Sequence, residues 1–379
     1  MNVPLVDMRR QYNLIKEEID AAVKRVMESG RYIMGEEVES FEDELARYCG
    51  TKYAIGVSSG TDALYLALRV FDIGHGDEVI SVPFTFMATT EAICLAGARP
   101  VFVDIDPRTF NMDTSKIEKA ITRKTRAIMP VHLYGYPADM DPIIKLAKKY
   151  KLVVIEDAAQ AIGAEYKGKQ AGTIGDIGTL SFFPSKNLGA CGDAGAVLTN
   201  RKDLVRKLKM LREHGSLKKY FHDFIGTNSR LDALQAAVLK VKIKHLDRWT
   251  EKRREFAKIY NNMLKPTENM VLPVEFPGNK HVYNQYTLCI KKRENLKNYL
   301  ENNEIQSVSY YPLPMHLQKA FKFLNYKKGD FLESERAART VLSIPIWPEL
   351  GNEKIIYVAE KINEYYRKSR KIALTRQKK

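Results

Sequence analysis

Three short segments of this chain carry side chains that could do chemistry, and each follows a predicted buried strand. Residues 58–62, Ser-Ser-Gly-Thr-Asp, open a predicted helix, where backbone N–H groups and the helix dipole favour an anion. Asp157 ends an apolar run, and a buried carboxylate there needs a partner. Lys186 follows the turn 183–185, and a lysine just beyond a buried strand can have a lowered pKa and form a Schiff base.

Each of these segments also has an ordinary structural explanation. Ser59 and Asp157 are typical helix caps, Lys186 alone is an ordinary surface lysine, and the glycine-rich segment 189–196 suits a hairpin turn. Their order along the chain favours a catalytic site over these structural explanations. The anion site comes first, the acid follows, and the amine lies 29 residues after the acid, so all three would come from strands of one sheet. Such a site suits pyridoxal phosphate (PLP), since an acid near the pyridine nitrogen keeps the ring protonated and able to accept electrons.

The segments that must position these residues alternate between short apolar runs and amphipathic stretches. The apolar runs are rich in β-branched residues and mostly not alternating, which is typical of strands buried on both faces. They predict strands at Tyr53–Val57, Glu78–Val82, Pro100–Asp104, Arg126–His132, Leu152–Glu156, Gly178–Phe182 and Ala194–Thr199. The stretches between them predict helices at Thr61–Phe71, Ala88–Leu95, Ser115–Ile121 and Met140–Tyr150. This alternation predicts an α/β fold with a mainly parallel sheet and helices on both faces.

The pattern changes after Asn200. We expect helices at Lys202–Glu213 and Leu231–Thr250, the second continuing through Arg253–Leu264, and a loop-rich connection over residues 265–280. The last part predicts a smaller α+β domain with a strand at Gln285–Ile290, a helix at Glu294–Asn302, a strand at Ser307–Tyr311 and a helix at Glu353–Tyr366. The predicted domains are therefore residues 1–250, with an N-terminal segment 1–30, and residues 251–366, followed by a disordered basic tail at 367–379.

Composition excludes several classes of protein. Apolar residues make up 45% and charged residues 28%, as in soluble globular proteins, and no apolar run is long enough to span a membrane. The N-terminus lacks the apolar stretch of a signal peptide. Four cysteines without metal-ligand spacing indicate no metal site, no disulfide framework and a cytoplasmic location. The tail carries +7 of the net +15 and is expected to be solvated, so we expect no nucleic-acid or membrane partner, whereas the remaining charge suits anionic substrates.

Four motifs give the chain a specific resemblance to a known family. They are GVSSGTDAL at Gly56–Leu64, VIEDAAQA at Val154–Ala161, SFFPSKNLG at Ser181–Gly189 and NSRLDALQAA at Asn228–Ala237. With them, nearly the whole chain resembles a sugar-nucleotide aminotransferase of the DegT/DnrJ family. The resemblance implies the fold-type I architecture of PLP-dependent transferases, in which a large domain with a mixed, mostly parallel sheet flanked by helices precedes a smaller C-terminal α+β domain.

The resemblance also implies roles at the matching positions. Lys186 would bind PLP as a Schiff base and shuttle a proton to and from the substrate carbon. Asp157 would pair with the pyridine nitrogen, and Gln160 would lie near the ring hydroxyl. Phe86 falls where the family stacks an aromatic side chain on the ring, with a core aromatic as the alternative.

A further set of positions would bind the cofactor phosphate. By the same resemblance these are Gly60, Thr61 and Ser181, together with Asn228 from the neighbouring subunit, and Ser59 is a further cofactor contact. The family therefore implies a homodimer with two shared active sites.

The implied reaction moves an amino group from L-glutamate, which becomes 2-oxoglutarate, to a nucleotide-linked keto sugar. Segments 228–232 and 310–316 resemble the branch that aminates C3, which implies a 3-amino sugar nucleotide for surface glycan or related biosynthesis; amination at C4 is the alternative. Arg230, Tyr311 and His316 are candidate substrate contacts, with a dimer-interface ion pair, a core tyrosine and a surface histidine as the alternatives. Tyr310 stands where relatives often have histidine, and the sequence does not distinguish dTDP from UDP.

Two other functions compete with transamination. A dehydratase branch of the family has histidine in place of the lysine, so Lys186 argues against dehydration. A non-catalytic regulatory or nucleic-acid-binding relative would have the basic tail as its only support, and it would have no use for Lys186 and Asp157.

Overall fold

The computed structural model describes the backbone of residues 1–377 and the side chains of residues 1–368. Its central sheet has seven strands: β1 (Tyr53–Val57), β2 (Glu78–Ser81), β3 (Arg99–Phe102), β4 (Thr125–Ile128), β5 (Val153–Asp157), β8 (Ile177–Ser181) and β9 (Gly195–Thr199). They lie in the order β1-β9-β8-β5-β4-β2-β3. All neighbours from β8 to β3 are parallel, whereas β9 is antiparallel to β1 and β8. The predicted α/β class with a mixed, mostly parallel sheet is confirmed.

Helices cover both faces of this sheet because its strands are apolar on both sides. Ala196 and Leu198 of β9 share a core with helices α2 (Lys16–Ser29), α3 (Glu36–Cys49) and α9 (Ala233–Ile243). Val197, between them on the strand, joins a second core with α4 (Gly60–Val70), α5 (Met87–Leu95) and α8 (Lys202–Arg212). Helices α6 (Ile117–Ala120) and α7 (Met140–Tyr150) belong to a third core, and α1 (Met8–Leu14) precedes α2.

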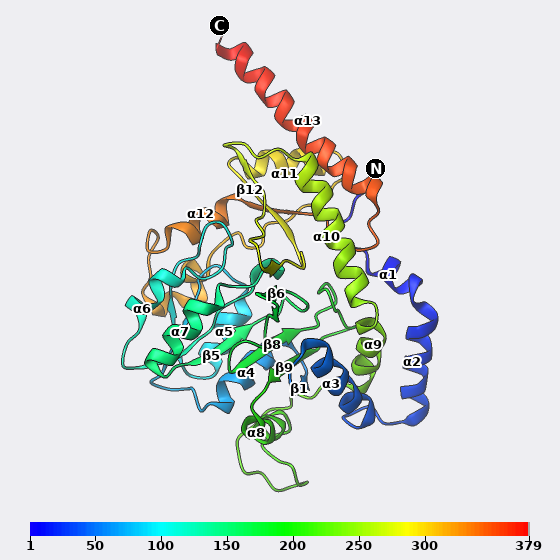
Figure 1. Ribbon diagram of the computed structural model, residues 1–379, viewed down its shortest axis with the longest axis vertical. Helices are drawn as coiled ribbons and strands as arrows, with labels where there is room; N and C mark the ends of the chain where they lie inside the picture. The colour runs from blue at the N-terminus through cyan, green and yellow to red at the C-terminus, as the bar shows by residue number, and fades with distance from the viewer. Residues whose placement is uncertain (378–379) are drawn as a thin grey trace.

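One long helix joins the sheet domain to a smaller unit (Figure 1). Helix α10 (Leu246–Met263) buries Leu246 and Trp249 in the core beside α9, and it buries Phe256 and Tyr260 in a separate core. That core also contains strands β10 (Met270–Val271), β12 (Tyr286–Ile290) and β13 (Val341–Ile344) and helices α11 (Arg293–Glu301) and α13 (Asn352–Gln377). The predicted domain boundary at residue 250 falls within α10, so the exact division remains a prediction.

Three segments differ from the expected elements. Residues 307–311 form no strand; Val308 makes one bridge to Ser343, and β13 is the strand that pairs with β12. The predicted helix 231–250 starts at Ala233 and breaks between Ile243 and Leu246. Helix α13 continues past Tyr366 to Gln377, where we expected a disordered tail, because lysine and arginine are good helix formers; residues 378–379 lie outside the described residues.

Short elements complete the chain. A second small sheet contains β6 (Glu165–Tyr166), β7 (Lys169–Gln170) and β11 (Asn279–Lys280). Helix α12 (Leu332–Thr340) follows 3-10 turns at Met315–Leu317 and Lys319–Leu324, and further 3-10 turns lie at Thr114–Lys116 and Leu133–Gly135. Among the residues described, no helix has the length and apolar character needed to cross a membrane.

Candidate active site

A cavity of about 470 Å³ lies beyond the carboxyl ends of β5 and β8, which is where open α/β sheets bind ligands. Its volume is in the range of small-molecule sites. Eight predicted cofactor contacts and one predicted substrate contact line it: Ser59, Gly60, Thr61, Phe86, Asp157, Gln160, Ser181, Lys186 and Tyr311. Residues that are as much as 252 positions apart in the sequence (59 and 311) therefore meet in one space.

One wall of the cavity is the N-terminus of α4. Ser59 caps this helix by accepting a hydrogen bond from the backbone N–H of Asp62 at 3.0 Å. The first N–H groups of a helix have no acceptor within it and can bind an anion. The close approach of β8 requires glycine at position 60, because a Cβ atom there would lie 2.6 Å from the Cβ of Ser181. The wall can therefore hold a phosphate against backbone and hydroxyl groups.

Asp157 is the buried acid of the cavity. Its Oδ2 accepts a 2.7 Å hydrogen bond from the Thr89 hydroxyl, which lies 2.9 Å from the Thr85 hydroxyl. Its Oδ1 accepts a 3.2 Å bond from the backbone N–H of Ala159. All three side chains are buried, so these contacts fix the orientation of the carboxylate. A cationic ring nitrogen in the cavity would complete its pairing.

Glu156, the neighbouring acid, has a structural role instead. Its side chain lies on the other side of β5 from that of Asp157, because successive strand residues alternate. It is fully buried and accepts hydrogen bonds from His132 Nε2 and from the backbone N–H groups of Gly172, Ile174 and Gly175. This network ties the loop before β8 to the sheet and leaves Asp157 as the acid that faces the cavity.

Lys186 stands in a tight turn after β8. The backbone N–H of Lys186 donates to the carbonyl of Phe183 at 2.8 Å, and a Cβ at Gly189 would lie 2.2 Å from the carbonyl oxygen of Pro184. Burial lowers the pKa of the Lys186 amine to about 8, against an opposing effect of Asp157. The Nζ atom makes no hydrogen bond or ion pair with any residue whose side chain is described. The amine is therefore available for covalent chemistry.

Aromatic side chains form another part of the wall. Phe86 is 56% exposed, so in this chain it is not the core aromatic of the alternative interpretation. Its ring centre lies 5.8 Å from that of Tyr311. Gln160 donates to the Tyr311 hydroxyl at 3.0 Å and accepts from the backbone N–H of Tyr134 at 2.7 Å. Burial raises the pKa of Tyr311, so its hydroxyl stays protonated at neutral pH.

Three predicted site residues are not in this cavity. His316 is buried beside Phe331, and its Nε2 lies 3.2 Å from Glu335 Oε1, so it is neither a surface histidine nor part of the cavity wall. Arg230 is partly buried, and its backbone bridges to that of Val57 at the end of β1. Asn228 is exposed, and its backbone bridges to that of Glu213; the chain between these two residues projects from the body of the molecule (Figure 1).

Several residues of the wall were not predicted from the sequence. Thr85 and Thr89 are four positions apart at the start of α5, and this spacing places two hydroxyls on one side of a helix start. Thr85 also stands directly before the predicted cofactor contact Phe86, so the spacing of the two threonines could have indicated that they belong to the site. Phe183 and Ser185 lie in the motif at Ser181–Gly189, and Asp193 lies in the glycine-rich segment 189–196, although none of them was assigned a role. Tyr310 belongs to segment 310–316, and Gln285 alone among these residues carries no local signal.

Together these features meet the requirements of PLP. The cavity supplies an anion site built around Gly60, a buried carboxylate at Asp157, a deprotonatable amine at Lys186 and an exposed ring at Phe86. These are the groups needed for the phosphate, the ring nitrogen, the aldehyde and the ring face of the cofactor.

Comparisons with known proteins point to the same chemistry. The model of the DegT/DnrJ/EryC1/StrS aminotransferase family matches residues 13–363. The "Pleiotropic regulatory protein" of Geobacillus stearothermophilus is 50% identical and covers 97% of this chain and 99% of its own length. The "dTDP-3-amino-3,4,6-trideoxy-alpha-D-glucose transaminase" of Streptomyces venezuelae is 43% identical over 96% of both chains. The "UDP-N-acetyl-3-dehydro-alpha-D-glucosamine 3-aminotransferase" of Acidithiobacillus ferrooxidans is 45% identical over 94% of this chain and 96% of its own.

A solved structure is similar over nearly its whole length. The crystal structure of S. venezuelae DesV in complex with a ketimine intermediate superposes with a TM-score of 0.94 and 43% identity. The alignment covers 96% of this chain and 98% of that chain. The overall architecture described above is therefore that of a known enzyme structure.

Proposed function

Because this chain belongs to the DegT/DnrJ/EryC1/StrS aminotransferase family, and is therefore a PLP-dependent aminotransferase, we propose that it transfers an amino group from L-glutamate to C3 of a nucleotide-linked keto sugar. The observation that carries this proposal is the shared cavity of Lys186, Asp157 and the α4 N-terminus. The product would be a 3-amino sugar nucleotide for surface glycan or related biosynthesis, and 2-oxoglutarate would be released.

We propose that the residues of the cavity have different roles in this reaction. When bound, PLP supplies the electron sink for transamination. We propose that Lys186 Nζ would hold the cofactor covalently and, as a neutral base, would move a proton at the substrate carbon. Asp157, held by Thr89, would keep a proton on the ring nitrogen. Gln160 and Phe86 would orient the ring, and Ser59, Gly60, Thr61 and Ser181 would hold the phosphate.

The lowered pKa of Lys186 predicts a specific pH dependence. Only the neutral amine reacts with an aldehyde, so the rate of PLP binding to cofactor-free protein should rise with pH around a midpoint of about 8 and then level off. The visible absorbance of the bound cofactor, followed over time at each pH, measures this rate. A lysine with its ordinary pKa would give a rate that still rises at about pH 10, and that result would contradict the assigned environment.

The choice of C3 rests on two supports. Relatives that are 43% and 45% identical are named for amination at C3, and the segment from Asn228 to Asp232 resembles that branch. Their names contain dTDP and UDP respectively, so the nucleotide remains open. We expect PLP-loaded protein with glutamate to aminate nucleotide-linked 3-keto sugars in preference to matched 4-keto sugars, measured by mass spectrometry of the products. Preference for a 4-keto sugar would overturn the choice, and amination of neither would overturn the proposed substrate class.

We also propose that the enzyme is a homodimer in which Asn228 and Arg230 complete the neighbouring site. The segment that precedes them exposes apolar side chains, among them Tyr220, Phe221 and Ile225, which is 87% exposed. Large exposed apolar surfaces are typical of contacts between proteins. Such a dimer predicts that Lys186→Ala and Asn228→Ala subunits, each with little activity alone, regain activity when mixed and refolded together. No recovery, with mixed dimers present by mass, would contradict shared sites.

A non-catalytic regulatory function is the second candidate because one relative carries a regulatory name. It predicts salt-sensitive DNA binding and no visible absorbance of purified protein. The arrangement of Lys186, Asp157 and Thr89 has no use in such a protein, so we favour catalysis. A cytoplasmic location remains part of the proposal, supported by four cysteines that form no disulfide.

A further inference from the structure

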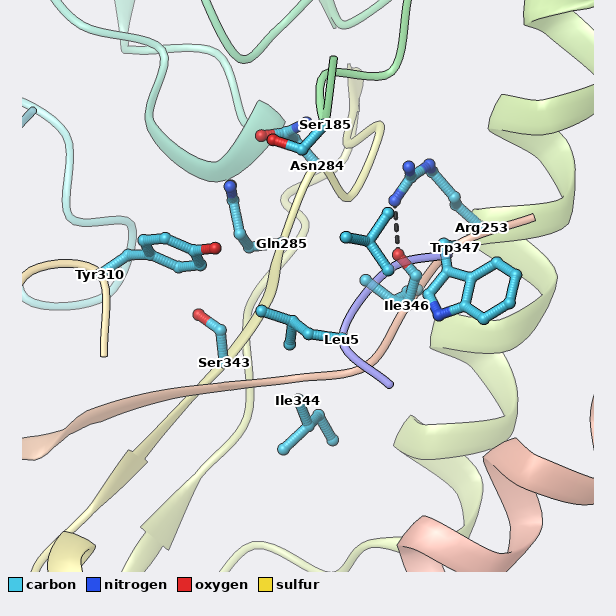
Figure 2. A pocket seen from close by; sticks show the side chains of 11 residues that line it. Leu5, Ser185, Arg253, Asn284, Gln285, Tyr310, Ser343, Ile344, Ile346 and Trp347 are labelled. Atoms are coloured by element: carbon cyan, nitrogen blue, oxygen red, sulfur yellow. Dashed lines mark hydrogen bonds between the residues drawn. The ribbon is translucent and has the colours of Figure 1, made fainter. Parts of the chain in front are cut away.

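A second, smaller cavity adjoins the active site. Its volume is about 50 Å³, and it lies between the N-terminal segment and the small domain (Figure 2). Three residues, Ser185, Gln285 and Tyr310, line both cavities. The remaining wall is formed by Leu5, Val6, Arg253, Asn284, Ser343, Ile344, Ile346 and Trp347. Since a site for one water needs about 10–15 Å³ by this measure, the space suits a few waters or a single carboxylate group.

Arg253 makes this small cavity cationic. Its side chain is only 6% exposed, and Nη1 donates to the carbonyl oxygens of Tyr283 and Ile346. Among the residues described, Nε and Nη2 have no acceptor and no carboxylate forms an ion pair with the guanidinium. Glu349 acts on it only at longer range, and burial raises the pKa of Glu349 and so disfavours its charged form. A buried cation that lacks a partner is energetically unfavourable, so the unpaired N–H groups of Arg253 favour the binding of an anion.

Two amides add unpartnered acceptors to the same wall. Asn284 donates from Nδ2 to Asn187 Oδ1 at 3.0 Å, which fixes the direction of the amide and leaves its Oδ1 buried without a donor. Gln285 Oε1 is also buried without a donor, and Gln285 lies on the wall shared with the active site. The small cavity therefore offers a positive charge for an anion, and its shared wall offers the Gln285 oxygen for an N–H group, a combination that suits an amino acid extending from the active site into this space.

We propose that Arg253 binds the side-chain carboxylate of the amino donor and thereby selects a dicarboxylic amino acid. The α-carboxylate is bonded to the reacting carbon, so it must stay beside Lys186 in the larger cavity. The side-chain carboxylate of glutamate is separated from that carbon by two methylene groups and can enter the adjoining space. Ser185, next to Lys186 in the chain, stands on the wall between them. Gln285 Oε1 can accept a hydrogen bond from the donor's ammonium group. This inference rests on the proposed aminotransferase function.

Variants of two adjacent arginines test it. The PLP-loaded enzyme is mixed with glutamate, and the loss of its visible absorbance gives the half-saturating glutamate concentration. Arg253→Met should raise this concentration by about 10- to 100-fold, as expected for a lost charge-assisted hydrogen bond, while the KM for the keto sugar stays unchanged. Arg254→Met is the matched control: Arg254 follows on the same helix but pairs with Glu275 and the His281 carbonyl outside the small cavity. Equal effects on glutamate and keto sugar, or none on glutamate, would overturn the inference.

Wild-type enzyme provides a test that needs no variant. Glutarate has both carboxylates but no amine, and butyrate has only one carboxylate. Glutarate should compete with glutamate at least about 10-fold more tightly than butyrate, and Arg253→Lys, which keeps the charge but loses the forked donors, should reduce the difference. Equal inhibition by the two acids would reject the site. Wild-type enzyme that does not react with glutamate at all would instead reject the proposed donor.

Discussion

Replacing Lys186 with alanine is expected to lower the rate of the glutamate half-reaction by at least about 10⁴-fold, because the variant loses both the covalent anchor and the base. Among the described residues of the cavity wall, Lys186 alone has a free side-chain amine, and its pKa, lowered to about 8 by burial, allows a neutral form near physiological pH. Rapid-mixing absorbance with wild-type and variant protein measures the rate.

The control for this variant is Lys148→Ala, which removes an exposed lysine of helix α7. It should keep the wild-type rate and spectrum. The Lys186→Ala protein should fold normally, since Lys186 Nζ makes no hydrogen bond with the described residues. A folded Lys186→Ala enzyme that turns over with glutamate at more than about a hundredth of the wild-type rate would refute the role of the lysine.

Replacing Asp157 with asparagine is expected to give the second largest loss, about 100-fold in kcat. A neutral amide cannot hold a proton on the ring nitrogen as a carboxylate does, and a hydrogen bond to a charged group is worth up to about 3 kcal/mol. The PLP dissociation constant should rise as well, because the cofactor loses a charged contact. Both quantities are measured with wild-type and variant protein, the second by titration of the cofactor-free form.

Two threonines provide a graded control for this prediction. Thr89→Val removes the hydroxyl that donates to Asp157 and should give a smaller loss in the same direction. Thr90→Val changes the next residue of α5, which is buried but whose hydroxyl has no hydrogen-bond partner among the described residues, and it should leave both quantities unchanged. Equal effects of the two valine variants would show that Thr89 acts through packing and not through Asp157.

Much of the sheet could be predicted because its strands are buried on both faces. Such strands are continuous apolar runs, and the expected ends of β1 at Tyr53 and Val57 are those observed. The predicted strand Arg126–His132 stops at Ile128, since the following residues include Pro130, which has no N–H to donate. The strand expected at 307–311 failed for a related reason: Pro312 and Pro314 follow it, and Tyr310 and Tyr311 line the cavity instead of pairing.

The residues of the candidate site could be predicted where a motif stands at the end of a strand. They could not be predicted where their position depends on contacts with elements far away in the sequence. Lys186 and Asp157 follow from their positions after β8 and at the end of β5. His316 was placed at the site by the resemblance of its loop, but its contact with Glu335 arises from α12, which has no signal near residue 316. In the sequence Arg253 is one of many charged residues on a predicted helix, and only the fold brings the carbonyls of Tyr283 and Ile346 to it and buries it.

We expect Lys186 to carry the cofactor, and borohydride reduction followed by peptide mass mapping identifies the lysine that does so. Purified protein with PLP is reduced, digested and analysed for the mass of a reduced pyridoxyl phosphate group. We predict that the group is found on the peptide that contains Lys186 and that it disappears when the protein is first incubated with glutamate. Modification of a different lysine, or no modification of a protein that has bound PLP, would contradict the assignment of Lys186 as the cofactor-binding lysine.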